Sequence, residues 1–262
     1  MPEIQKKKTS ALTAVAIVLL VAALIAMAVY LVFITSPEST NGAESDQSAS
    51  APEFSAPESS EPEEISAELK STLAEAEVGN LVRYGNYIQD QEYYGNEEPA
   101  EATPIEWIVL DKQEGKLLLL SYRCLGLWQY DESRESGKTT FTESSLFKRL
   151  NESFYATAFS DEEKSFILGE EGQKVFILSA EQAERYLTPD SHRIARASRT
   201  AASHHGKDES KPVEWWLADV VSPGFAAYVY TDGSIRLKGF AFDYDEVGVR
   251  PAIWVSTEAE AE

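Results

Sequence analysis

The segment "YTDGSIRLKGFAFDYDEVGVRPAIWV", from Tyr230 to Val255, decides the fold class of this chain. Its Asp232-Gly233 dipeptide lies between two strand-like runs, "AAYVY" and "SIRLKGF", and predicts a hairpin with a two-residue type I′ turn. In the closing run "GVRPAIWV" the residues alternate as in a further strand, and Pro251 favours a sheet edge or a bulge. The segment therefore predicts parts of an antiparallel sheet and not a catalytic loop.

More strands and a few helices are predicted ahead of this segment. The runs "GNLVRYGNYI" and "PIEWIVLDKQEGKLLLLSYRC" read as three strands, the last two joined by a turn at Gly115. Residues 117–120 are all leucine, which predicts a central strand that is covered on both faces. Three serines have the spacing of helix N-caps: Ser144, Ser160 and Ser179. We expect an α+β domain with an antiparallel sheet and two or three short helices.

The N-terminal quarter predicts a membrane anchor and a stalk. Residues 11–34 carry no charge and would form about 36 Å of helix, enough to cross a hydrocarbon core of about 30 Å. Lys6, Lys7 and Lys8 precede this stretch, so the positive-inside rule places the N-terminus in the cytoplasm. The apolar run is longer than that of a cleaved signal peptide, and no clear A-x-A cleavage site follows it. An uncleaved signal anchor is therefore the favoured interpretation.

The acidic Ser/Pro/Glu-rich segment that follows has too little apolar surface to repay the entropy of ordering. The expected organisation, of a single-pass cell-membrane protein with its C-terminal domain outside the cell, has five parts. They are a cytoplasmic N-terminus (1–10), a transmembrane helix (11–34), a disordered linker (35–66), an extracellular globular domain (67–256) and a flexible tail (257–262).

Composition excludes several classes of function. The net charge of −21 repels phosphate backbones, which argues against a nucleic-acid partner. One cysteine, Cys124, follows a strand-like run; it forms no intramolecular disulfide, and a buried structural role is expected for it. The chain lacks the G-x-S-x-G, H-E-x-x-H, P-loop and EF-hand patterns. No catalytic residue and no cofactor is therefore predicted.

A ligand-binding face is predicted from exposure patterns and not from a motif. Residues 188–212 show no regular pattern and carry three arginines, which suits either an anion-binding loop or a solvated loop whose arginines pair with acids. The tryptophan pair at 215–216 suits either a binding rim or, for at least one indole, the core. The predicted ligand-binding residues are Arg193, Arg196, Arg199, Trp215, Trp216, Tyr230 and Arg250.

Two weak constellations could bind a metal. Asp243, Asp245 and Glu246 could offer oxygen ligands to Ca²⁺, although the rest of a coordinating loop is missing. His204 and His205 with Asp208 are a second set, but neighbouring loop histidines seldom converge on one ion. No metal site is predicted from either.

Several blocks together resemble a family of uncharacterised extracellular or phage-associated domains found in Gram-positive bacteria. They include "RYGNYIQD", "SLFKRLNESFYATAFSDEEKSFI", "WWLADVVSPG" and "GVRPAIWV", within residues 78–255. The second half is also similar to the C-type-lectin-like fold, which formylglycine-generating enzymes share. That enzyme chemistry needs a cysteine pair, which this chain lacks. Family members often read W-W-L-R-S, where this chain has Ala218 and Asp219.

The leading hypothesis is a membrane-anchored, non-catalytic binding module outside the cytoplasm of a Gram-positive bacterium. Its partners would be the membrane and a cell-surface glycan, peptide or protein. An enzyme of unknown reaction and a structural part of an envelope complex remain as alternatives. An enzyme should show a deep pocket with convergent polar groups, and a binding module a shallow groove or a flat aromatic patch.

Overall fold

The computed structural model describes residues 71–92, 101–135 and 137–258. Helical residues 71–75 precede a five-stranded sheet in the order β1-β2-β3-β12-β5, in which every neighbouring pair is antiparallel. The strands are β1 (Leu81–Tyr87), β2 (Thr103–Gln113), β3 (Lys116–Ser121), β12 (Ala252–Ser256) and β5 (Ile167–Leu168). The last strand of the chain thus lies inside the sheet, beside β3, and not at the edge that Pro251 had favoured.

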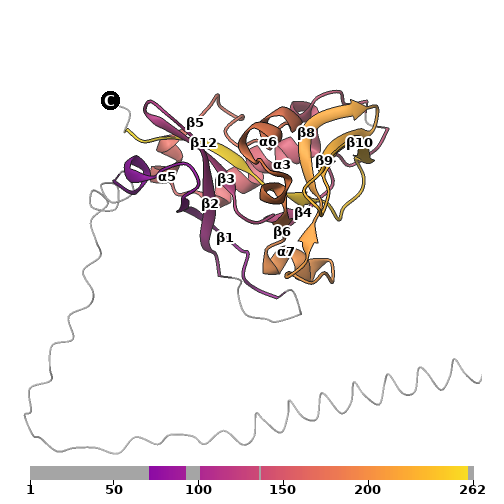
Figure 1. The fold of residues 1–262 in the computed structure, drawn as a ribbon, viewed down its shortest axis with the longest axis horizontal. Helices are drawn as coiled ribbons and strands as arrows, with labels where there is room; N and C mark the ends of the chain where they lie inside the picture. The colour runs from indigo at the N-terminus through magenta and orange to yellow at the C-terminus, as the bar shows by residue number, and fades with distance from the viewer. Residues whose placement is uncertain (1–70, 93–100, 136, 259–262) are drawn as a thin grey trace, which may run out of the picture. The chain divides into compact units, whose positions relative to one another are not determined.

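A second five-stranded sheet has the order β10-β9-β8-β11-β4. Its members are β10 (Ile235–Ala241), β9 (Phe225–Val229), β8 (Trp215–Ser222), β11 (Gly248–Val249) and β4 (Gly126–Leu127). The pairing of β11 with β8 is parallel, and the other pairs are antiparallel. Figure 1 shows β8, β9 and β10 together on one side of the domain and β1, β2 and β3 on the other. A short ribbon pairs β6 (Ala195–Arg196) with β7 (Pro212–Val213).

The β9–β10 hairpin corrects the predicted two-residue turn. The amide of Tyr230 donates to the carbonyl of Ser234, and the amide of Gly233 donates to the carbonyl of Tyr230, both at 2.8 Å. The loop is therefore three residues long, with Gly233 at φ +86°. This is the geometry of a type I turn closed by a glycine in the left-handed region. Asp232 stabilises it because its carboxylate accepts from the amide of Ser234 at 2.9 Å.

The helices are all short and most lie in the middle of the sequence. They are η1 (Phe141–Glu143), α3 (Ser145–Arg149), η2 (Leu150–Phe154), α4 (Tyr155–Ala158), α5 (Asp161–Phe166), α6 (Ala180–Tyr186), η3 (Asp190–Arg193) and α7 (Arg199–His204). The predicted caps are confirmed: Ser144 accepts from the amide of Phe147, and Ser160 and Ser179 form capping boxes. The structure has more helices than the two or three predicted, because the central helical run is divided into consecutive short segments.

Strand β3 separates two hydrophobic cores. Leu117 and Leu119 belong to one cluster, which includes Trp107 and Trp216, while Leu118 and Leu120 belong to the other. All four leucines are fully buried. The predicted central strand with apolar cover on both faces is therefore confirmed.

The predicted fold class and location need correction. The described residues form two five-stranded sheets with short helices, instead of one sheet preceded by a transmembrane helix. Within ranges 71–92, 101–135 and 137–258, no helix has the length and apolar character to cross a membrane. The predicted transmembrane helix at 11–34 and the linker at 35–66 lie outside the described residues. The single-pass cell-membrane location depended on that helix and is not supported.

Candidate functional site

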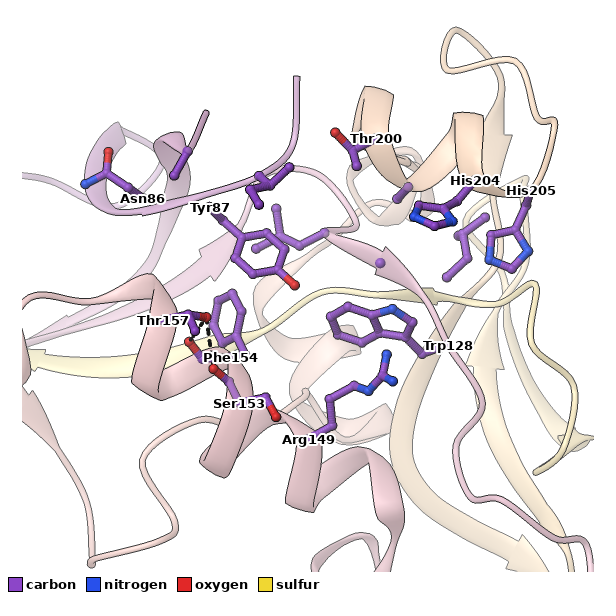
Figure 2. Close-up of a pocket in the computed structure, with 16 residues that line it drawn as sticks. Asn86, Tyr87, Trp128, Arg149, Ser153, Phe154, Thr157, Thr200, His204 and His205 are labelled. Atoms are coloured by element: carbon purple, nitrogen blue, oxygen red, sulfur yellow. Dashed lines mark hydrogen bonds between the residues drawn. The ribbon is translucent and has the colours of Figure 1, made fainter. Parts of the chain in front are cut away.

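A cavity of about 760 Å³ opens between the end of β1, strand β4, the helical run from η2 to α4, and α7 (Figure 2). This volume lies in the range of pockets that hold small ligands, about 300–1,000 Å³. Its aromatic lining residues are Tyr87, Trp128 and Phe154, and its polar ones are Asn86, Arg149, Ser153, Thr157, Thr200, His204 and His205. Aliphatic side chains supply most of the remaining wall.

Two aromatic groups face each other across the cavity (Figure 2). On one side, the Tyr87 and Phe154 rings meet edge to face, with centroids 5.2 Å apart. On the other side lies the indole of Trp128. The backbone carbonyl of Trp128 accepts a 2.7 Å hydrogen bond from the Trp216 indole. The buried Trp216 thus anchors the segment that carries Trp128. Such walls favour a ligand with an apolar or aromatic body.

A π-helical turn forms the floor of the cavity. In η2 the amide of Tyr155 donates to the carbonyl of Leu150, five residues earlier. This widened turn lies between α3 and α4 and contains Ser153 and Phe154, both of which line the cavity. Single π-helical turns inside α-helices occur often at functional sites.

The side chain of Asn151 fastens this turn to the rest of the domain. Its amide nitrogen donates to the carbonyls of Val175 at 2.8 Å and Phe147 at 3.1 Å. Its oxygen accepts from the amide of Val175 at 2.9 Å. Asn151 therefore pairs both backbone groups of a fully buried residue and fixes where the turn lies.

Gly126 sets the position of the Trp128 indole. A Cβ atom on Gly126 would lie 2.1–2.6 Å from three atoms of that ring. Only glycine leaves room for the indole to fold back over β4. The absence of a side chain at Gly126 thus determines where the Trp128 indole lies.

Among the described residues that line the cavity, Arg149 is the only one with a formal charge. Its guanidinium lies over the Trp128 ring, 4.9 Å from the centroid. The side chain is exposed, and among the described residues no carboxylate lies within ion-pair distance of it. Burial raises the pKa of Tyr87, and the nearby Arg149 charge partly opposes that rise. The cavity thus presents a positive charge beside aromatic surface.

A smaller cavity of about 500 Å³ adjoins the first and shares Leu127, Trp128, Arg149 and His205 with it. It differs in charge, because it also contains the acids Glu132, Glu152 and Asp245. Trp128 and Arg149 therefore lie between the larger cavity, whose described lining has no acid, and the smaller cavity, which has three.

The three predicted loop arginines do not form one anion site. Arg193 is buried and donates to the carbonyls of Gly233 and Leu187, both at 2.8 Å, and pairs with Asp190. Arg196 is exposed and donates to the carbonyl of Ser210 at 2.9 Å. Arg199 forms an ion pair with Glu92. Each guanidinium already has a partner within the domain.

The other predicted ligand-binding residues do not form one exposed face either. Trp215, Trp216 and Arg250 are buried, and the Arg250 guanidinium lies over the Trp215 ring at 5.1 Å. The Trp215 indole donates to the carbonyl of Arg193 at 2.8 Å. Tyr230 is 38% exposed and stacks with Arg236 instead. The structure thus brings Arg193, Trp215 and Arg250 together in the interior, whereas the Tyr230 side chain is partly exposed.

The residues named as metal candidates mostly have other partners. Asp243 pairs with Arg134 and Glu246 with Lys207, while Asp245 lines the smaller cavity. His204 and His205 both line the larger cavity, but Asp208 accepts from the amide of Ser210. In the part of the chain that the structure describes, no group of three or more His, Cys, Asp or Glu could hold a metal ion.

Cys124 lies in the interior, where its backbone bridges to Ala197. Burial raises the pKa of its thiol to about 12, and the nearby Arg250 opposes this only in part. A nucleophilic cysteine needs a lowered pKa and access to solvent, so the thiol is placed as a core side chain.

A family model described as a domain of unknown function (DUF6273) matches residues 114–257. No curated protein and no solved structure matches the chain. The matched region contains Trp128, Arg149 and the two histidines of the cavity. Tyr87 and the rest of the β1 wall lie ahead of it, so the cavity is built from both the matched region and the strand before it.

Proposed function

The chain belongs to the DUF6273 family of domains of unknown function, and we propose that it is a non-catalytic binding module whose ligand occupies the larger cavity. The observation that carries the proposal is the cavity itself: about 760 Å³, two facing aromatic walls, and a guanidinium without a carboxylate partner among the described residues. Pockets of this size with few polar groups are the usual form of small-ligand sites. The site is a cavity and not the shallow groove or flat aromatic patch that the sequence predicted for a binding module, so the proposal depends on the polar groups of the lining.

The polar groups of the lining support binding over catalysis. The Thr157 hydroxyl donates to the carbonyls of Ser153 and Phe154, and the Thr200 hydroxyl accepts from the amide of Gln91. Among the described residues, no serine or threonine hydroxyl of the lining is hydrogen-bonded to a histidine. Nucleophilic catalysis by a hydroxyl requires such a base. Cys124, the other nucleophile type, is buried in the core.

The net charge of −21 supports a ligand other than nucleic acid. The glycan, peptide and protein ligands of the leading hypothesis belong to this proposal. Of these, a ligand that inserts an apolar part suits the cavity better than a flat contact with a folded protein surface.

The test is a cavity-filling variant of the full-length chain. Ser153 is exposed and lines the cavity, so Ser153→Trp should occupy it without disturbing the core. Ala156→Trp, three residues further along and outside the lining, is the matched control. A small-molecule fragment set is screened by saturation-transfer NMR, and the fragments that bind the wild-type chain should lose binding to Ser153→Trp and keep it with Ala156→Trp. Equal fragment binding by both variants would reject the cavity as the ligand site.

A further inference from the structure

We infer that the ligand of this cavity is an amphiphilic organic acid, whose apolar or aromatic body lies between Tyr87 and Trp128 and whose carboxylate pairs with Arg149. This inference rests on the proposed binding function and adds the chemical class of the ligand. Three features support it: the charge of the cavity lining, the position of the Arg149 guanidinium and the polarity of the other lining residues.

The charge of the lining is opposite to that of the chain. The chain carries 44 acids against 23 bases, yet among the described residues no Asp or Glu lines the larger cavity. Arg149 is the formal cation there, and the two histidines lie on the same lining. In a strongly acidic protein, a concave surface whose described lining has one arginine and no acid attracts anions locally.

The geometry of Arg149 suits a carboxylate. Its guanidinium lies over the Trp128 indole at 4.9 Å, so the ring covers one face of the planar group and restrains it. The N–H donors lie in the plane of the guanidinium. No described residue accepts a hydrogen bond from them. A planar fork of free donors is the geometry that binds a carboxylate through two parallel hydrogen bonds.

The rest of the lining suits an apolar body better than a sugar. Sugars carry many hydroxyls that each need a partner, but the Thr157 and Thr200 side chains already bond to backbone groups. The Tyr87 hydroxyl points into the cavity (Figure 2) and has no hydrogen-bond partner among the described residues. The Tyr87 phenol and the Arg149 guanidinium lie beside the rings of Phe154 and Trp128, and Asn86, Ser153 and the two histidines supply the other polar side chains. Aromatic walls beside one cation match a ligand with an apolar body and an anionic end.

Two sources share this chemistry: the C-terminus of a peptide with an apolar last residue, and a free amphiphilic acid. The experiment measures binding of matched pairs to the full-length chain by calorimetry. The peptide arm compares N-acetyl-Ala-Phe with its C-terminal amide, and the second arm compares decanoate with decanol. We expect the acid to bind about ten-fold tighter than its neutral partner in at least one arm, and added salt to reduce that preference. The arm with the stronger preference identifies the source.

Arg149→Met tests the role assigned to the guanidinium, because the methionine keeps apolar contact with Trp128 and removes the charge. Arg185→Met is the matched control, since the Arg185 guanidinium also stacks on an aromatic ring, Tyr186, at 5.1 Å. The preference for the acid should disappear in the first variant and persist in the second. Equal affinity of acid and neutral partner for the wild type overturns the ligand class and leaves the cavity function standing. A preference that survives Arg149→Met overturns the role of Arg149, and binding of no acid at all overturns the inference whatever the fragment screen shows.

Discussion

Replacement of Asn151 by leucine should destabilise the domain by about 3 kcal/mol. The side chain makes three hydrogen bonds, two of them to the amide and carbonyl of Val175, a residue with no exposed surface. Each buried backbone group left without a partner costs about 1–3 kcal/mol, so the two together cost about 2–6 kcal/mol. Burial of the added apolar surface of leucine returns about 1 kcal/mol.

The assay is urea unfolding of wild type and variant, compared at equal slope so that the midpoint shift reports stability. Because Asn151 fastens the π-helical turn that carries Phe154, fragment binding in the cavity should also weaken. A loss below about 0.5 kcal/mol would refute the claim that Asn151 satisfies the Val175 backbone.

Asn151→Asp adds a pH dependence with a definite sign. An aspartate oxygen can still accept from the Val175 amide, but its other oxygen faces the carbonyls of Val175 and Phe147, which accept hydrogen bonds and donate none. This raises the pKa of the new carboxyl in the folded state above its ordinary value of about 3.9. Its stability contribution is therefore present below about pH 4 and is lost as the pH rises through the folded pKa. The deficit relative to wild type should be larger at pH 7 than at pH 4; an equal deficit at both would contradict the assigned contacts.

Three further changes test other parts of the domain. Burial raises the pKa of the Cys124 thiol to about 12 from an ordinary 9, so the stability that the neutral thiol contributes is present below pH 9 and is lost above it. Between pH 8 and 10.5, the free energy of unfolding in urea titrations should fall by about 2 kcal/mol more for wild type than for Cys124→Ala. Gly126→Ala should shift tryptophan fluorescence and cost about 1–3 kcal/mol, whereas in a Trp128→Ala background it should cost much less; equal costs would show that the indole is not the obstacle. Arg193→Met should lower the thermal midpoint strongly and Arg199→Met hardly at all, because the first guanidinium is buried with three partners and the second is a surface ion pair.

Local structure could be predicted wherever neighbouring residues determine it. The capping boxes at Ser160 and Ser179 needed only a glutamate or glutamine three residues later, and the double-sided strand needed only four consecutive leucines. The hairpin turn was predicted at the right place but with the wrong length. The Asp232 carboxylate binds the following backbone amide and Gly233 takes the left-handed position, which stabilises a three-residue loop.

The functional residues could not be predicted in the same way, because partners distant in sequence decide exposure. Arg193 looks like a loop cation, yet it is buried because the carbonyl of Gly233, forty residues away, accepts from it. Trp128 and Arg149 were not singled out, although the cavity depends on them. Their only signal in the sequence is a glycine two residues before the tryptophan, and that signal has meaning only once the indole is known to fold back over the strand.

The closing segment of the chain has a role that its strand pattern alone did not reveal. Strand β11 belongs to one sheet and β12 to the other, so the two residues between them, Arg250 and Pro251, form the crossing from sheet to sheet. The Arg250 guanidinium donates to the carbonyl of Ser121, where β3 ends, and lies over the ring of Trp215, where β8 begins. Burial lowers the pKa of this arginine to about 10, which shows the cost of holding a charge there. A buried cation is tolerated at this point because its donors and its flat face connect both sheets at once, whereas an aliphatic side chain would leave the end of β3 without a hydrogen-bond donor. The cavity depends on this connection, since β1 lies in the first sheet and β4 in the second, and each supplies one of its walls.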